Sequence, residues 1–266
     1  MSIIDSIIRK TALISGLLAS TQIWAQPQIQ SVLECMHANV PDTAQFQNLQ
    51  ISYVNRLQET STYELQLFAQ HGKGEFEATA IIKKPARLTG GAYLLRSTSE
   101  NYQVYMYAPS LGQVRRVSGD GITKATLLGT DLGWEDLQIM YNAFMEGSMS
   151  LKGEAEVQGR PVYQLQLIPS PKTISVYNRI YLDVDKESCI PLEIRLMAQG
   201  DQLHKRFMAD ANSLIKVEGK YWYASRSQLT DVREGTRTEV TVLTQAEADE
   251  KLRARVFNPK SFYNSR

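Results

Sequence analysis

Hydrophobic and polar positions alternate with a period of two along most of this chain. Within Ser61–Gln70, for example, every second residue from Tyr63 to Ala69 is apolar, as expected for a strand buried on one side. Glycine-containing turns such as His71–Gly74 separate the alternating runs and predict antiparallel hairpins. The predicted strands are Phe46–Glu59, Ser61–Gln70, Phe76–Lys83, Arg87–Ser97, Tyr102–Ala108, Val114–Ser118, Ser148–Val157, Val162–Ile168, Ile174–Val184, Cys189–Ala198, Leu203–Ala211, Ile215–Glu218, Lys220–Leu229 and Thr236–Leu243.

A helical period replaces the alternation in two places. Gln28–Asn39 has apolar residues at relative positions 0, 3, 4 and 7 from Ile29, which predicts an amphipathic helix that ends before Pro41. Trp134–Phe144 predicts a second, short helix, with Asp131 at its start. The tail Ala246–Phe257 is of mixed polarity and predicts one helical turn before Asn258 and Pro259.

These elements together predict a mainly β protein. A long antiparallel sheet cannot stay flat and open, so it must curl, split into a sandwich or close into a barrel. The simplest arrangement places the N-terminal helix and the short central helix against the concave face, as in a half-open β-barrel. We find no internal repeat and no linker, so residues 26–266 are expected to form one domain.

The first 25 residues have a different character. Arg9 and Lys10 precede the apolar run Thr11–Ala19, which is the layout of a signal peptide, with cleavage expected after Ala25. The alternative is a membrane anchor, but a spanning helix needs roughly 18 to 20 apolar residues. The sequence therefore predicts an exported protein.

Charge and cysteine content narrow the possibilities. The chain has 29 Lys and Arg against 28 Asp and Glu, a net charge of +1, so binding of nucleic acid by bulk charge is not expected. An exported chain with two cysteines, Cys35 and Cys189, allows one disulfide. The alternative is a pair of buried free thiols. An oxidising compartment and an even count favour the disulfide.

The sequence offers little for covalent chemistry. His37, His71 and His204 have no metal-ligand spacing, and no serine or cysteine follows a nucleophile motif. Glu135 and Asp136 are adjacent, so they point in different directions and suit a helix start better than acid–base catalysis. We expect neither an enzyme nor a cofactor nor a metal site.

The stretch Met106–Asp136 connects the chain to a known family. It combines a Tyr-x-Tyr-x-Pro-x-Leu strand from Tyr105, an Arg-Arg-Val strand from Arg115, and Leu-Gly-Thr-Asp-Leu-Gly-Trp-Glu-Asp-Leu from Leu128. In this it resembles the periplasmic outer-membrane lipoprotein-sorting proteins, the LolA-like family. The resemblance implies a half-open barrel whose helical lid covers an apolar cavity for acyl chains. It further implies a monomer in the periplasm, with a lipid or an acylated lipoprotein as ligand and an inner-membrane transporter as a possible partner.

The candidate cavity and lid residues are apolar and aromatic. They are Tyr93, Leu95, Tyr105, Tyr107, Leu127, Leu128, Trp134, Leu137, Tyr141 and Phe144. Taken singly, most would suit an ordinary core. The segment Leu127–Phe144, however, is apolar and has Gly129 and Gly133 close to its start, a composition typical of a mobile lid. We interpret the protein as a carrier in transport to the outer membrane. The alternative is a sensor or scaffold domain of the same fold that serves a membrane transporter.

Overall fold

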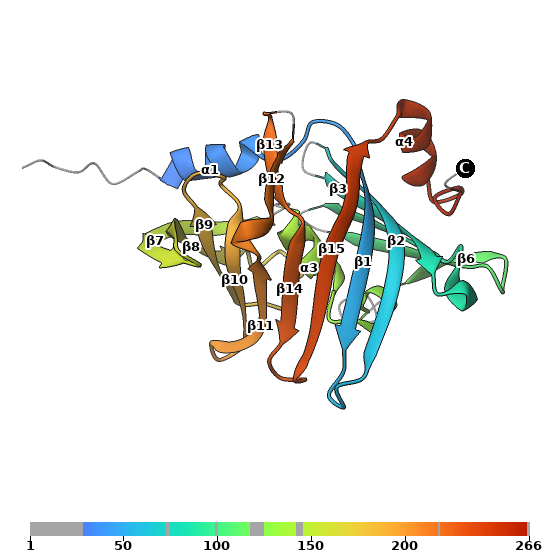
Figure 1. Cartoon of the computed structure of the whole chain (residues 1–266), viewed down its shortest axis with the longest axis horizontal. Helices are drawn as coiled ribbons and strands as arrows, with labels where there is room; N and C mark the ends of the chain where they lie inside the picture. The colour runs from blue at the N-terminus through green and yellow to red at the C-terminus, as the bar shows by residue number, and fades with distance from the viewer. Residues whose placement is uncertain are drawn as a thin grey trace, which may run out of the picture.

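One antiparallel sheet of 13 strands forms most of the molecule (Figure 1). The computed structural model describes residues 29–72, 75–98, 101–117, 125–141, 146–217 and 219–264, so the expected signal peptide lies outside the described residues. The spatial order of the strands is β6-β5-β4-β3-β2-β1-β15-β14-β11-β10-β9-β8-β7. The sheet ends at β6 on one side and at β7 on the other, so within the described residues it stays open, as predicted.

The strands of the main sheet are between 5 and 12 residues long and are joined mostly by tight turns. The main sheet contains β1 (Gln45–Val54), β2 (Thr60–His71), β3 (Glu75–Lys84), β4 (Ala92–Thr98), β5 (Tyr102–Ala108), β6 (Gln113–Val117), β7 (Gly147–Val157), β8 (Arg160–Pro169), β9 (Arg179–Asp185), β10 (Pro191–Ala198), β11 (Gln202–Ala209), β14 (Arg226–Asp231) and β15 (Thr236–Glu247). A separate two-stranded sheet contains β12 (Leu214–Val217) and β13 (Tyr221–Ala224). Helical elements are α1 (Ile29–Ala38), α3 (Trp134–Met140), α4 (Glu250–Val256) and the 3₁₀ turns η1 (Ala86–Leu88), η2 (Leu127–Gly129) and η3 (Ala211–Ser213).

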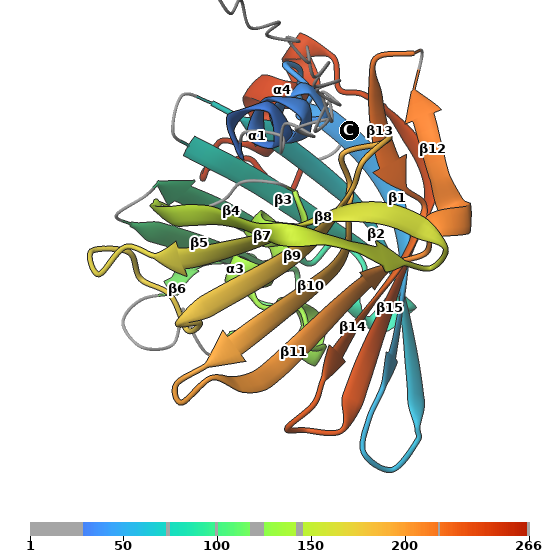
Figure 2. The same cartoon turned by 90° about the vertical axis from the view of Figure 1, so that its left-hand side faces the viewer.

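The sheet curves around α3 (Figure 2), and a hydrophobic core lies on each of its faces. The larger core fills the concave side, where the inward residues of β1, β2 and β8–β11 meet α3 and the buried side of α1. Val32 and Met36 supply that side of α1, as the helical period predicted. A smaller core lies on the outer face of β1–β5, covered by α4 and the residues after it. Because both faces of β4 and β5 are covered, these strands carry apolar residues on both sides.

Most predicted elements are confirmed, with boundary corrections. The predicted strand Lys220–Leu229 is two strands, because the chain leaves the main sheet at β13 and rejoins it at β14, with Ser225 N–H donating to the carbonyl of Ser213 (2.9 Å). β9 begins at Arg179 instead of Ile174, and β15 continues to Glu247. The tail forms a full α-helix, α4, capped by the Asp249 carboxylate that accepts from Leu252 N–H (2.8 Å).

Among the described residues, no helix has both the length and the apolar character needed to cross a membrane.

Candidate ligand cavity

A cavity lies on the concave face, between the sheet, α3 and the β12–β13 hairpin. Its empty volume is about 1200 Å³, including the part that opens to solvent. The volume that the centres of water molecules can occupy inside it is about 150 Å³, room for roughly ten waters or for part of a flexible apolar ligand. Its walls come from inward positions of β1, β2, β10, β11 and β15, which the period-two alternation directs to this side.

Most of the wall is apolar. On β1, Leu49 and Ile51 face the cavity. On β2, Leu65, the partner of Leu49, and Leu67, the partner of Gln47, do the same. All four side chains are buried. Surface of this kind favours hydrocarbon over water by about 25 cal/mol for each Å² that is buried.

One end of the cavity is polar, and its side chains are joined by hydrogen bonds. We call this set the glutamine belt; it consists of Thr43, Gln45, Gln47, Tyr141, Tyr221 and Gln245. The Tyr141 hydroxyl donates to Gln47 Oε1, and Gln47 Nε2 donates to Gln245 Oε1 (2.8 Å). Gln245 Nε2 then donates to the Tyr221 hydroxyl (3.2 Å).

The same series continues to the loop before β1. The Tyr221 hydroxyl donates to Gln45 Oε1 (2.7 Å), and Gln45 Nε2 donates to Thr43 Oγ1 (3.0 Å). Gln45 and Gln47 are only 6% and 7% exposed. Buried amides are stable when they are hydrogen-bonded, and here the belt residues satisfy one another.

No described residue of the cavity wall is charged at neutral pH. The wall contains no Lys, Arg, Asp or Glu among these residues, and its one histidine is His71. Burial, together with the nearby His37, lowers the pKa of His71 to about 4, so its imidazole is neutral. Burial also raises the pKa of Tyr141, which therefore remains a hydroxyl donor. The cavity thus offers apolar surface and neutral hydrogen-bonding groups.

The helix α3 is fixed to the sheet by a buried ion pair. Asp136 Oδ2 lies 2.6 Å from Lys205 Nζ on β11, and both side chains are buried. Asp136 also accepts hydrogen bonds from the Tyr177 hydroxyl (2.6 Å) and from Gly133 N–H (2.8 Å). The bond to Gly133 closes the first turn of α3, so the predicted role of Asp136 at the helix start is confirmed.

The predicted role of Asp131 is wrong. Gly133, not Asp131, is the residue that precedes the first turn of α3. The Asp131 carboxylate instead accepts from the hydroxyls of Thr236 and Thr238 on β15, at 2.8 Å from Thr238, and it ties the preceding loop to the sheet. Asp136, five positions after Asp131, supports the start of the helix because its carboxylate reaches back to accept from Gly133 N–H.

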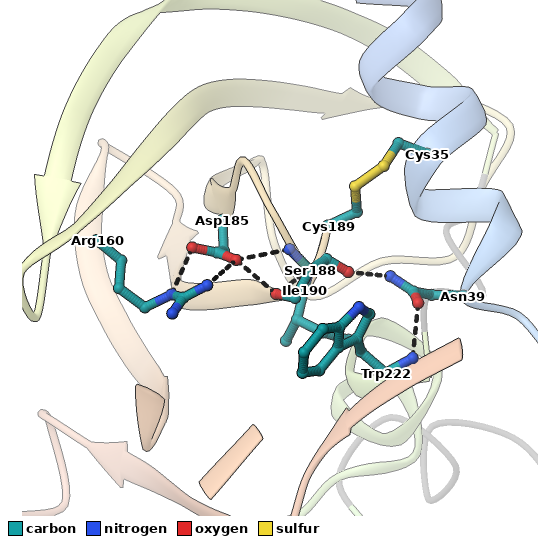
Figure 3. The surroundings of a disulfide bond; sticks show 8 residues. All are labelled: Cys35, Asn39, Arg160, Asp185, Ser188, Cys189, Ile190 and Trp222. Atoms are coloured by element: carbon teal, nitrogen blue, oxygen red, sulfur yellow. Dashed lines mark hydrogen bonds and ion pairs between the residues drawn. A yellow bond between two sulfur atoms is a disulfide. The ribbon is translucent and has the colours of Figure 1, made fainter. Parts of the chain in front are cut away.

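A disulfide and two hydrogen bonds hold α1 at the rim of the cavity (Figure 3). The Cys35–Cys189 disulfide joins α1 to the turn between β9 and β10, with a Cα–Cα distance of 5.8 Å, which confirms the pairing favoured by the sequence. Asn39, just after α1, donates to the carbonyl of Ser188 and accepts from Trp222 N–H (2.8 Å). Asn39 and Trp222 both line the cavity.

The turn that carries Cys189 is itself well anchored. Arg160 donates to both Asp185 oxygens, Nε to Oδ1 (2.7 Å) and Nη2 to Oδ2 (2.9 Å). Asp185 Oδ2 also accepts from Ser188 N–H and Oγ, both at 2.7 Å. Burial alone would raise the pKa of Asp185, but these donors outweigh it and lower the pKa. These contacts therefore fix the position of the turn to which the disulfide attaches α1.

The ten predicted cavity residues separate into groups. Leu127, Leu137 and Tyr141 line the cavity. Tyr93, Leu95, Leu128 and Trp134 belong to or pack against the concave core, with the rings of Tyr93 and Trp134 5.6 Å apart, and are not part of the cavity wall. Tyr105 and Tyr107 pack on the outer face, where Tyr107 stacks on Tyr263 at 3.9 Å. Phe144 lies outside the described residues.

Sequence reasoning missed the hairpin and the belt. Tyr221, Trp222 and Tyr223 all line the cavity, although the sequence placed them in one long strand of the main sheet. The run of three aromatics directly after Lys220 was the available signal. The belt glutamines could not be identified from the sequence, because glutamine also occurs on exposed strand faces. Among the described residues, no cluster of three or more His, Cys, Asp or Glu is placed to hold a metal ion.

The fold matches solved structures over most of the chain. An outer membrane lipoprotein-sorting protein domain from Vibrio parahaemolyticus is 20% identical, covers 89% of this chain and 98% of its own, and gives a TM-score of 0.76. A DUF1329 family protein from Desulfovibrio piger gives the same TM-score at 22% identity, with coverage of 86% and 97%. A LolA superfamily protein from Nitrosomonas europaea gives 0.63 at 16% identity, with coverage of 86% and 96%. The chain therefore has the LolA-like fold.

A protein-family model matches the chain from β3 to the end of the described residues. The model of a family described as an uncharacterized protein matches residues 74–264, and the chain belongs to that family. No curated protein matches the chain.

Proposed function

We propose that this protein is a periplasmic carrier that takes acyl chains of a lipid or a lipoprotein into the cavity and takes part in their transport to the outer membrane. The observation that supports this most directly is the predominantly apolar cavity on the concave face of a LolA-like fold. The carrier performs no covalent chemistry and acts as a monomer. It is exported by the signal peptide and cleaved after Ala25.

The energetics of such a ligand suit the walls. Each methylene that leaves water contributes about 0.8 kcal/mol, so a chain with about 14 buried methylenes contributes roughly 11 kcal/mol. Loss of overall motion on binding opposes this by roughly 4 to 15 kcal/mol. The two terms are of similar size, so each methylene shifts the balance: long acyl chains bind more tightly than short ones, and binding stays reversible, as a carrier requires.

The segment Leu127–Phe144 is the proposed lid, and its anchoring limits how it moves. The Asp136–Lys205 ion pair and the Asp131 contacts hold the start of the segment to β11 and β15. The part after Asp136, which includes the cavity residues Leu137 and Tyr141, is tied to β1 by the Tyr141–Gln47 hydrogen bond. Opening then requires release of that bond and of the hydrogen bond from Gln138 to Ser97 on β4, and the buried ion pair serves as the pivot.

Solvent extraction of the purified protein and mass spectrometry test the carrier function. We expect co-purified lipid or acylated peptide, and uptake of the apolar fluorophore N-phenylnaphthylamine after delipidation. Ala69→Trp, which fills the cavity from β2, should abolish uptake. The matched control Gln66→Trp lies on the same strand but points away from the cavity, and it should take up the fluorophore normally. A chain that carries no lipid, binds no fluorophore and captures a membrane transporter would instead support the sensor or scaffold function.

A further inference from the structure

The polarity of the cavity wall changes in one direction along two of its strands, β1 and β15. On β1, the inward residues run Gln45, Gln47, Leu49 and Ile51. On β15, Gln245 pairs with Gln47, and Val242 pairs with Leu49. The inward residues of β1 and β15 therefore change from polar to apolar at paired positions of the two strands. The wall has the polarity profile of an amphiphile, with the tail toward Ile51 and the head group at the glutamine belt.

The belt is unnecessary for a ligand made only of hydrocarbon. Gln45 and Gln47 occupy the same inward series as Leu49, so leucine at these positions would extend the apolar wall without a change of register. Buried amides instead impose a requirement for hydrogen-bond partners. Glutamine and tyrosine can exchange one another's hydrogen bonds for bonds to a ligand, since each amide carries two donors and an acceptor with two lone pairs.

The chemistry of the belt also selects against charge. The described wall residues include no cation that could neutralise a phosphate or a carboxylate, and no anion that could neutralise an amine. An ionised group that moves from water into such a site loses its hydration without an ionic partner. Esters, amides and hydroxyls lose less free energy of hydration, because hydrogen bonds to the belt replace their hydrogen bonds to water one for one.

We propose that the glutamine belt binds the uncharged, hydrogen-bonding head group of an acyl ligand, such as the ester, amide or hydroxyl groups of an acylglycerol. This inference rests on the proposed carrier function and names the class of ligand for the same cavity. Two sources share this chemistry, namely a free neutral glycerolipid and the acylated N-terminus of a lipoprotein, which carries a diacylglyceryl group and an amide-linked chain. Charged phospholipid head groups are excluded from the belt.

Competition against bound N-phenylnaphthylamine tests the proposal on the delipidated, full mature chain. Three competitors carry comparable tails: monopalmitoylglycerol, hexadecane and palmitoyl lysophosphatidic acid. We expect monopalmitoylglycerol to displace the fluorophore at a concentration at least about tenfold lower than lysophosphatidic acid, from the loss of hydration that the charged head group suffers. It should also compete better than hexadecane, by about two- to tenfold for each hydrogen bond that the belt contributes.

Substitutions in the belt should remove this preference. In Gln47→Leu/Gln245→Leu, monopalmitoylglycerol should lose its advantage over hexadecane, and hexadecane should bind more tightly because the wall becomes more apolar. Gln50→Leu makes the same change on the exposed face of β1 and is the matched control, with the preference retained. Circular dichroism and the urea midpoint establish that each variant is folded, and Gln47→Asn provides a milder change if the double variant is not.

The outcomes separate this proposal from the carrier function. Equal affinity for monopalmitoylglycerol and lysophosphatidic acid, or a preference that survives in Gln47→Leu/Gln245→Leu, would overturn the head-group proposal while the carrier function stands. Failure of the fluorophore itself to bind would refute both. Dipalmitoylglycerol and a synthetic diacylglyceryl-cysteinyl peptide then identify the source, and tight binding of either one supports the proposal.

Discussion

Glu135 should make the stability of the protein depend on pH in an unusual direction. Its carboxylate sits in the first turn of α3, where it accepts from Val176 N–H (2.9 Å) and from the Ser175 hydroxyl. Burial raises the pKa of Glu135 from 4.5 to about 7, although the Ser175 and Val176 hydrogen bonds act in the opposite direction. The folded protein therefore retains a proton on Glu135 at pH values where the unfolded chain has lost it.

The sign and size follow from proton linkage. Between pH 4.5 and 7 the folded state binds more protons at this site than the unfolded state, so the free energy of unfolding falls as the pH rises. At about 1.36 kcal/mol for each pH unit, the rise in pKa corresponds to roughly 3 kcal/mol. The contribution is fully present below pH 4.5 and is lost above pH 7. Glu135→Gln cannot titrate and should remove this dependence.

Urea unfolding of wild type and Glu135→Gln at pH 4.5, 5.5, 6.5 and 7.5 measures the effect. The stability of the variant relative to wild type should increase by roughly 3 kcal/mol across this range. His71, whose lowered pKa of about 4 makes stability rise with pH up to 6.5, is present in both proteins and cancels in the difference. Ser175→Ala removes a hydrogen bond that lowers the pKa of Glu135, so it should move the transition to higher pH. A difference between variant and wild type that is the same at every pH would refute the argument.

Three further predictions concern the rim, the pivot and the leader. Cys35→Ala/Cys189→Ala should lower the free energy of unfolding by roughly 5 kcal/mol, as the chain-entropy account gives for a separation of 154 residues, and wild type should show no free thiol under denaturing, non-reducing conditions. Lys205→Met should cost about 3 to 5 kcal/mol in urea unfolding, because it leaves Asp136 buried and unpaired, and Lys205→Met/Asp136→Leu should recover most of the loss. N-terminal sequencing of protein from the periplasmic fraction should begin at Gln26, and an intact Met1 would contradict the proposed signal peptide.

The sequence predicted the β architecture well because alternation is a local property. Residues such as Tyr63, Leu65 and Leu67 reveal an inward face without knowledge of the partner strand. The helix α1 and its disulfide were predictable for the same reason, since the period around Val32 and the cysteine count are both visible in the chain. The resemblance carried by Tyr105–Leu137 then supplied the fold class.

The cavity lining was harder to predict, because alternation shows that a strand has two faces but does not say what covers each one. Tyr105 and Tyr107 occupy one face of β5, and only the position of α4 shows that this is the outer face. Trp134 fits a helical stripe, yet it packs beside Tyr93 in the core. Gln47 and Gln245 lie on strands about 200 residues apart in sequence. They meet only because β1 and β15 pair in the folded sheet.

That ladder has a consequence for how the protein folds. β1 and β15 pair in the middle of the sheet, from Gln45 with Glu247 to Val54 with Arg237, so almost the whole chain must be present before the pairing can form. The strands on either side of it are built mainly from hairpins that are local in sequence. Local contacts form faster than distant ones, so we expect two hairpin arrays that assemble early and join late. A chain that emerges gradually from a translocation channel would hold β1 as an unpaired edge until its C-terminus arrives, and in that interval it would be open to aggregation and to binding by chaperones.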